Sequence, residues 1–379
     1  MAERKYQICS KCVMDTTVRS IRFDGEGVCN YCYMHDLMAD EYPLNERGKK
    51  ELWDMVEKVK KAGEGKRYDV ILGTSGGRDS TYTMWITKKI LGLRPLAVHF
   101  DNGWNSAIAV KNIERSCRKL EIDLETVVVD WEEFRDIQIA FLKASTSDVE
   151  VPTDVAIHAV MHRLAEQEGV NYIFNGHSFR TEGIAPIDWT YMDGRYIREV
   201  MNRFSDRKLK DYANFTLWDY FKYSFIKRIT VVPLLNFFPY EHKAANQLLE
   251  NELGWQYYGG HHEESTYTKF IQSYLLPQKF KVDRRRTEQS ALIRSGYTSR
   301  EKALAILGKE YQYDETLIRY VAEKFDMTDE EFQALYDLEP KSFRDYPSYF
   351  PYIRMLKGPL WLASRIGLIP QLLYLKFNG

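Results

Sequence analysis

The chain has 379 residues, with 53 Lys and Arg against 54 Asp and Glu and a net charge of -1. This length allows about two to three domains with sizeable cores. The balanced charge argues against a general binder of nucleic acid or membrane surfaces. The sequence has no charged start followed by an apolar run and no stretch of about 18 apolar residues. We therefore expect neither a signal peptide nor a transmembrane helix. The protein is expected to be cytoplasmic.

Four of the five cysteines lie in two close pairs near the N-terminus. Cys9, Cys12, Cys29 and Cys32 form a C-x₂-C-x₁₆-C-x₂-C pattern, whose spacing is typical of a zinc ion held by four thiolates. Redox chemistry is the alternative, but a thioredoxin-like C-x-x-C opens a helix after a strand, and we expect neither pair to do so. We predict a structural, zinc-ribbon-like segment over residues 1–45, because four thiolates leave no open position for a substrate.

Residues 46–240 are predicted to form an α/β domain. An amphipathic helix covers residues 46–62, and from residue 69 onward strand and helix signals alternate. Strands are predicted near 69–73, 95–100, 124–129, 171–175 and 229–235, and helices near 80–91, 106–120 and 154–168. This alternation predicts a parallel twisted sheet with helices on both faces. Cys117 is interpreted as a buried core thiol, and His158 and His162 as packing residues that lack a third metal ligand.

A glycine-rich turn joins the first predicted strand to the helix that follows it. Residues 73–80 read Gly-Thr-Ser-Gly-Gly-Arg-Asp-Ser. Glycines let the backbone approach a ligand closely, and the N–H groups of a helix start, with the hydroxyls of Ser75 and Ser80, suit an anion such as phosphate. The carboxylate of Asp79 repels phosphate unless a divalent cation lies between them. An ordinary turn is the alternative, although a turn does not require Ser, Asp and Ser at these offsets.

The carboxyl ends of the later strands carry further candidates, because ligands of open α/β sheets bind beyond these ends. Asp101 and Asn102 follow the second strand, where a ligand role and an ordinary turn are equally supported. Thr153 follows the third strand at a helix start, and helix capping by Thr153 or Asp154 is an adequate alternative to a substrate role.

Residues 241–379 are predicted to form a mainly helical region that binds substrate or a partner, with helices over 240–254, 299–307 and 314–335. Residues 259–269 form a Gly-rich polar run, followed by clustered Lys and Arg. Such cations suit pyrophosphate or a nucleotide-diphosphate substrate, although a solvated helix face explains any single Arg as well. From Gly358 onward the chain is apolar with few charges, which favours a docking surface over a membrane anchor.

Residues 75–80 resemble the SGGxDS signature of the PP-loop ATP pyrophosphatases, the superfamily of asparagine synthetase, GMP synthetase, NAD synthetase and tRNA thiolases. These enzymes split ATP into AMP and pyrophosphate, so the resemblance implies an adenine-nucleotide alpha-hydrolase-like fold with ATP and Mg²⁺. Residues 175–182 resemble the second signature, which implies that Glu182 joins Asp79 in holding Mg²⁺. The implied nucleotide-binding residues are Gly73, Ser75, Gly76, Gly77, Asp79, Ser80, Phe100, Asp101, Asn102, Gly176 and His177.

Over nearly its whole length the sequence is similar to the bacterial N-acetyl sugar amidotransferases of lipopolysaccharide O-antigen and pseudaminic- or legionaminic-acid pathways. The four cysteines, the glycine-rich loop, residues 101–105 and residues 259–280 carry this resemblance. It implies an enzyme that adenylates the acetamido oxygen of a free or nucleotide-linked sugar and replaces it with ammonia. Asp79, Glu182 and Lys269 are then the candidate catalytic residues. The candidate substrate-binding residues are Thr153, His261, His262, Glu264, Lys279, Arg284 and Arg285.

No cysteine of this chain has the context of a glutaminase nucleophile, so ammonia is expected from solution or from a separate glutaminase subunit, as the resemblance implies. Two alternatives stay open at this point. One is a tRNA-modifying PP-loop enzyme, which the net charge of -1 does not favour and for which no cysteine pair remains outside the predicted zinc site. The other is a scaffold that binds a nucleotide without catalysis.

Overall fold

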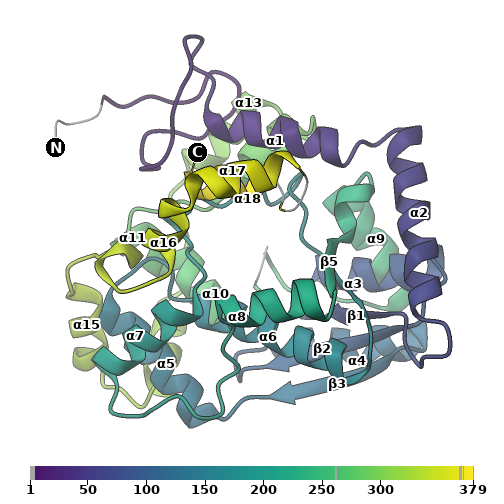
Figure 1. The fold of residues 1–379 in the computed structure, drawn as a ribbon. Helices are drawn as coiled ribbons and strands as arrows, with labels where there is room; N and C mark the ends of the chain where they lie inside the picture. Colours follow the sequence, from purple (N-terminus) through teal and green to yellow (C-terminus); the bar gives the residue numbers. More distant parts are fainter. Residues whose placement is uncertain (1–4, 261–262, 367–368, 370, 379) are drawn as a thin grey trace.

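The computed structural model describes residues 5–260, 263–366, 369 and 371–378 (Figure 1). Its centre is a five-stranded sheet in which every neighbouring pair is parallel and the strand order is β3-β2-β1-β4-β5. The strands are β1 (Val70–Gly73), β2 (Pro95–Asp101), β3 (Asp123–Val128), β4 (Tyr172–Asn175) and β5 (Thr230–Pro233). The chain therefore runs outward from β1 to β3 and then returns to the other side of β1. The predicted parallel sheet is confirmed.

Helices cover both faces of the sheet because successive side chains of a strand point to opposite sides. Val70 and Leu72 of β1 pack in one buried cluster, and Ile71 between them packs in another. The first cluster includes side chains of α2 (Glu46–Ala62), α3 (Arg78–Trp85), α4 (Ala107–Leu120) and α9 (His242–Leu253). The second is built mainly on α6 (Val151–Gln167). Cys117 belongs to the first cluster, which confirms it as a core thiol.

Local signals explain where several helices begin. Asn45 caps α2 and Ser106 caps α4, each by accepting hydrogen bonds from backbone N–H groups of the first turn. The predicted helix over 80–91 is α3 continued by a π-helical turn, Ile86–Ile90. Capping by Thr153 or Asp154 was a wrong alternative, because α6 begins at Val151 without any side-chain cap and both residues lie in its first turn.

The last third of the chain is mainly helical, as predicted. It comprises α10 (Thr266–Phe270), α11 (Leu276–Lys279), α12 (Arg285–Arg294), α13 (Arg300–Leu307), α14 (Glu315–Lys324), α15 (Asp329–Asp337), α16 (Phe350–Met355), α17 (Lys357–Arg365) and α18 (Gln371–Asn378). The single helix predicted over 314–335 is two helices, because Thr328 starts α15 with a capping box. No helix within the described ranges is long and apolar enough to cross a bilayer.

A third buried cluster joins the two ends of the chain. It contains the four N-terminal cysteines, side chains of α1 (Asn30–Glu41), α5 (Trp131–Ala144) and α7 (Gly194–Phe204), and aromatic residues of α10, α15 and α16. Figure 1 shows the N-terminal segment and α1 beside α13 and the C-terminal helices. The N-terminal segment therefore packs on the last third of the chain. The domain limits at residues 45 and 240 stay predictions.

Candidate active site

The glycine-rich turn lies at the carboxyl end of β1, where the sheet order changes direction between β1 and β4. Such a switch point is where open α/β sheets bind ligands. Gly76 has a φ of +75°, and a Cβ at this position would lie 2.2 Å from the carbonyl oxygen of Ala109. Gly77 precedes α3 and provides no side-chain cap for its N-terminus. The turn therefore has the backbone shape of an anion site, although the N–H groups of Ser75, Gly77 and Arg78 already donate within the protein.

The two predicted serine ligands of the turn lie next to each other. The Ser80 hydroxyl accepts a hydrogen bond from the backbone N–H of Ser75 at 3.2 Å, and the two hydroxyl oxygens are 3.3 Å apart. The backbone N–H of Gly77 donates to the Ser75 hydroxyl at 3.3 Å. These groups form a compact polar rim that suits phosphate oxygens.

A segment that follows α9 closes over this turn. Trp255 donates its indole N–H to the carbonyl of Gly76 at 2.9 Å, and the Tyr258 hydroxyl accepts from the backbone N–H of Arg78 at 3.3 Å. Glu264 accepts from the Ser75 hydroxyl at 3.1 Å. The structure thus brings the predicted substrate residue Glu264 to the nucleotide loop. Sequence reasoning missed Trp255 and Tyr258, although an aromatic run before two glycines was a visible signal.

Asp79 is held by two side chains. Its Oδ1 accepts from Arg78 Nε at 2.9 Å and from the hydroxyl of Tyr240. Arg78 Nε also lies 3.0 Å from that hydroxyl oxygen, so the three residues form a closed triangle. Burial, and then the charge of Asp79, raise the pKa of Tyr240 well above its usual range, which keeps the hydroxyl protonated. Tyr240 was not among the predicted site residues.

The turn after β4 packs against the start of α3. A Cβ on Gly176 would lie 2.9 Å from the carbonyl carbon of Asp79, so only glycine fits there. Glu182 binds His177, with Oε2 2.6 Å from Nδ1, and accepts from the backbone N–H of Ser178 at 3.1 Å. A shared Mg²⁺ between Asp79 and Glu182 stays a prediction. Two carboxylates plus substrate oxygens are a usual magnesium ligand set.

The residues after β2 form a self-bonded turn. Asp101 Oδ1 accepts from the backbone N–H of Gly103 at 2.9 Å and from Asn105 Nδ2 at 3.2 Å, and Asn102 Oδ1 accepts from the N–H of Trp104 at 3.2 Å. Phe100 packs edge-on against Phe134. These bonds agree with the turn interpretation, and a nucleoside contact stays a prediction. His99 Nδ1 lies 3.3 Å from the carbonyl of Thr74, and burial lowers the pKa of His99.

The remaining candidate substrate-binding residues do not converge on one site where an anion could bind. Lys269 pairs with Glu263 at 2.8 Å, and Arg284 lies 3.9 Å from Glu150. Arg285 is bound by both oxygens of Asp283 and stacks on Tyr311. Thr153 lies in the first turn of α6, with its N–H bonded to the carbonyl of Glu150. His261 and His262 lie outside the described residues.

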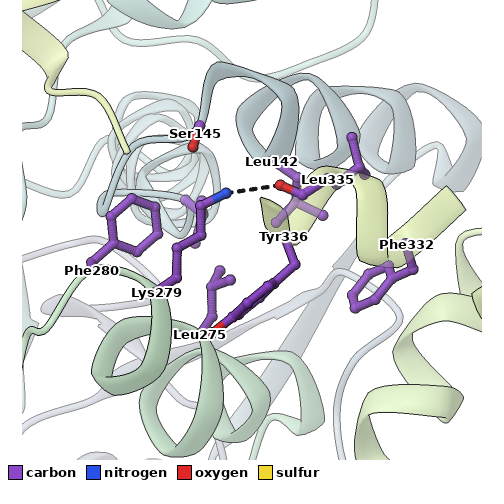
Figure 2. Close-up of a pocket in the computed structure, with 9 residues that line it drawn as sticks. Leu142, Ser145, Leu275, Lys279, Phe280, Phe332, Leu335 and Tyr336 are labelled. Atoms are coloured by element: carbon purple, nitrogen blue, oxygen red, sulfur yellow. Dashed lines mark hydrogen bonds between the residues drawn. The ribbon is translucent and has the colours of Figure 1, made fainter. Parts of the chain in front are cut away.

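Lys279 points into a pocket of its own (Figure 2). Its Nζ donates to the carbonyl of Leu335 at 2.8 Å, between the rings of Phe280 and Tyr336. The rest of the lining consists of apolar side chains of α5 and α15, of Leu275 and Val149, and of one polar residue, Ser145. Burial lowers the pKa of Lys279 to about 8. The structure therefore places this predicted substrate cation in an apolar hollow whose lining contains no residue of the glycine-rich turn.

The four N-terminal cysteines converge on one point. All four Sγ atoms are buried and lie within 4.8 Å of one another, with Cys9 to Cys32 at 3.8 Å and the pairs Cys12–Cys29 and Cys29–Cys32 at 3.7 Å. Four sulfurs placed tetrahedrally at the usual Zn–S distance of about 2.3 Å would be about 3.8 Å apart. The thiolates therefore fit a single zinc-sized ion. Among the described residues, this is the only group of three or more clustered metal-ligand side chains.

One expectation about these cysteines is met only in part, because the second pair opens a helix, but no named strand precedes that helix in the described part of the chain. Cys29 occupies the N-cap position of α1 and Cys32 lies in its first turn, so the second pair does open a helix. The sulfurs of both pairs nevertheless meet in one cluster, which a separate redox pair does not require. Arg294 reaches this cluster from α12, with Nη2 3.1 Å from Cys12 Sγ and Nε 3.3 Å from Cys32 Sγ. Its positive charge offsets part of the thiolate charge.

Comparisons with known proteins found a family model, a curated relative and solved structures. The family model described as "LPS biosynthesis protein WbpG-like, C-terminal domain" matches residues 264–357. The uncharacterized protein MJ1599 of Methanocaldococcus jannaschii is 30% identical over 172 residues, which are 45% of this chain and 58% of that protein. The chain therefore matches little more than half the length of this curated relative.

Two solved structures are similar at a distance. The NH3-dependent NAD synthetase of Campylobacter jejuni aligns over 75% of this chain and 99% of its own, with 16% identity and a TM-score of 0.32. The U34-tRNA thiolase NcsA of Methanococcus maripaludis, solved with its 4Fe-4S cluster, aligns over 80% and 89%, with 13% identity and a TM-score of 0.34. At these values, neither likeness carries an argument about the chemistry of this chain.

Proposed function

We propose that this protein is an ATP-dependent amidotransferase of surface-polysaccharide biosynthesis. It adenylates the acetamido oxygen of a free or nucleotide-linked N-acetyl sugar, and ammonia then displaces AMP to give an acetamidino sugar. The observation that supports this most directly is the 3.1 Å contact between Ser75 and Glu264. Ser75 belongs to the loop that suits ATP phosphates, and Glu264 is the first residue of the WbpG-like match. The loop that we propose binds ATP therefore contacts the first residue of the WbpG-like match.

The residues of this site suit the difficult step of that reaction. An amide oxygen is a poor nucleophile and a poor leaving group, so it must be activated by transfer of AMP with release of pyrophosphate. The loop N–H groups and the hydroxyls of Ser75 and Ser80 would bind the charge that develops on pyrophosphate. When bound, Mg²⁺ would add positive charge there, and we propose Asp79 and Glu182 as the residues that hold it. The four cysteines would hold a structural Zn²⁺.

In the second step, ammonia attacks the imidoyl carbon, the C–O bond to AMP breaks, and the nitrogen loses a proton. No residue of the chain needs to form a covalent intermediate. We propose that a separate glutaminase subunit supplies the ammonia and that the reaction takes place in the cytoplasm.

The test is a product analysis with ATP, Mg²⁺, ammonium and UDP-linked, CMP-linked or free N-acetyl sugars. We expect AMP, pyrophosphate and a sugar lighter by about one dalton, as oxygen is replaced by NH. The Asp79→Asn variant is the control and should form none of these. Formation of AMP only in the presence of tRNA would instead support an RNA-modifying enzyme. No AMP with any acceptor would support a nucleotide-binding scaffold.

A further inference from the structure

The last part of the chain carries an exposed apolar surface. We call it the C-terminal surface, and it is formed by α16 and α17. Its large side chains are between 47% and 80% exposed, although apolar residues of this size are normally buried. They are Tyr352, Met355, Leu356, Trp361, Leu362 and Ile366. Figure 1 shows α17 at the outside of the molecule, on the near side of the view.

The charge of this surface is one-sided. Residues 346–379 contain four Lys or Arg and no Asp or Glu, whereas the whole chain has a net charge of -1. Arg354, Lys357 and Arg365 are exposed beside the apolar side chains. Arg365 also lies over the ring of Trp361, with 5.7 Å to its centroid. Apolar side chains with Trp and a rim of cations are the pattern of helices that lie in the headgroup region of a membrane.

A second exposed apolar segment shows that exposed apolar side chains alone do not indicate which partner covers a surface. Residues 217–226 expose Trp218, Phe221 and Phe225. There, however, Lys222 and Lys227 both pair with Glu166, at 2.6 and 2.8 Å. Cations that are neutralised within the protein do not select an anionic partner, so this segment gives no indication of what covers it.

We propose that the C-terminal surface binds the surface of anionic lipid bilayers. Trp361, Leu362 and Ile366 would enter the boundary between headgroups and acyl chains, and the three exposed cations would contact lipid phosphates. α17 has nine residues, which is about half of the length that crosses a bilayer, so it lies on the membrane rather than across it. This inference goes beyond the proposed reaction and does not depend on it.

The experiment measures co-sedimentation of the full chain with sucrose-loaded vesicles. Phosphatidylcholine vesicles are compared with vesicles that contain phosphatidylglycerol, at low and high salt. We expect binding to the anionic vesicles only, weakened by salt because the charges are screened. The triple variant Arg354→Glu, Lys357→Glu, Arg365→Glu should lose at least ~10-fold in partition coefficient. Trp361→Ser with Leu362→Ser should lose a similar factor.

The matched control reverses three exposed charges elsewhere, by Lys50→Glu, Lys58→Glu and Lys61→Glu on α2. This control has the same change in net charge and should bind like the natural chain. Unchanged circular dichroism shows that each variant folds. The proposal is overturned if the natural chain stays in the supernatant with anionic vesicles at low salt, or if the control loses as much binding as the test variant. It is also overturned if light scattering shows a dimer that Trp361→Ser dissociates while lipid binding is absent.

Discussion

The carboxylate of Glu264 lies 3.1 Å from the hydroxyl of Ser75, inside a turn shaped to hold an anion. The backbone around it is fixed, because the carbonyl of Glu264 accepts from the N–H of Ser106 at 2.8 Å. A Cβ on Gly77 would come within 2.8 Å of the same carboxylate. A negative charge thus stands where phosphate would approach, which is favourable only with a cation between the two.

Glu264→Gln should therefore change how the protein responds to Mg²⁺. Without the metal, removal of a like charge worth about 1 kcal/mol should tighten pyrophosphate binding by about fivefold. With the metal, AMP formation should fall by at least ~10-fold, because the hydroxyl of Ser75 loses its charged acceptor beside the cation that we propose Asp79 and Glu182 hold. Titration calorimetry with and without Mg²⁺ measures the first effect. The control is Glu250→Gln, an exposed carboxylate on α9; equal behaviour of the two variants would contradict a role for Glu264 at the phosphate site.

Tyr240→Phe should weaken both the fold and the reaction. Its buried hydroxyl contacts Asp79 and Arg78, so the variant leaves those charged groups with one partner fewer. We expect a loss of about 1–3 kcal/mol in the free energy of unfolding, measured with urea. AMP formation should fall further than stability explains, since Asp79 loses its orientation. Tyr82→Phe keeps the ring that stacks on Tyr240 and should change neither quantity by a comparable amount.

Zinc content should follow the cysteine cluster. Cys29→Ser should lose stoichiometric metal, whereas Cys117→Ser, a buried thiol outside the cluster, should retain it. Arg294→Met should keep the metal but weaken its affinity by roughly 10- to 100-fold, because groups that contact metal ligands have effects of this size. Competition with a chromophoric chelator measures the affinity. Full metal retention by Cys29→Ser would sink the zinc assignment.

The contribution of Asp148 to stability should fall as pH rises between about 4 and 6, which opposes the gain from His35 and His158, whose pKa values are lowered by burial. Burial raises the pKa of this carboxyl from 3.8 to about 6, although Tyr196 donates to its Oδ1 at 3.0 Å. A raised carboxyl pKa stabilises the fold fully below the unfolded value and loses this contribution as pH passes the folded value. The loss amounts to about 3 kcal/mol in the free energy of unfolding.

Urea unfolding from pH 4 to pH 7 tests this dependence. Asp148→Asn keeps an oxygen that accepts from Tyr196 and lacks the ionising carboxyl, so its free energy of unfolding should gain about 3 kcal/mol relative to that of the natural chain between pH 4 and pH 7. Asp54→Asn, on the exposed side of α2, serves as the control and should leave the profile unchanged. Parallel profiles for the natural chain and Asp148→Asn would show that Asp148 does not titrate in this range.

Local patterns predicted the sheet because most of its strands are short apolar runs followed by turn residues, although the edge strand β3 is largely polar and exposed. The helix α5 was missed, although Asp130 caps it and Glu132 and Glu133 lie in its first turn. Those start signals were overlooked because the apolar residues of this helix, from Phe134 to Leu142, are not confined to one narrow face at helical spacing. The break before α15 was missed for a similar reason, since Thr328 acts as a cap only once the chain has turned.

The site could be predicted only where the chain itself brings residues together. The residues of the turn at 73–80 are contiguous in the sequence, so their types and order were enough to identify it. Tyr240 and Tyr258 reach it across more than 160 positions, and nothing in their spacing shows this. Consecutive arginines were misleading in another way, because neighbours on a helix point about 100° apart. Arg285 and Arg286 accordingly bind different partners, Asp283 and Asp15.

The contact of Arg294 with Cys12 also has a consequence for synthesis on the ribosome. The two residues are 282 positions apart, and Arg300, which binds the carbonyls of Cys9 and Cys12, is translated later still. At about 5–20 residues per second, the cysteines emerge roughly 15 to 60 s before the side chains that cover them. During that interval, the thiols are open to oxidants and to competing metals. Early loading with the correct ion would therefore protect the nascent chain.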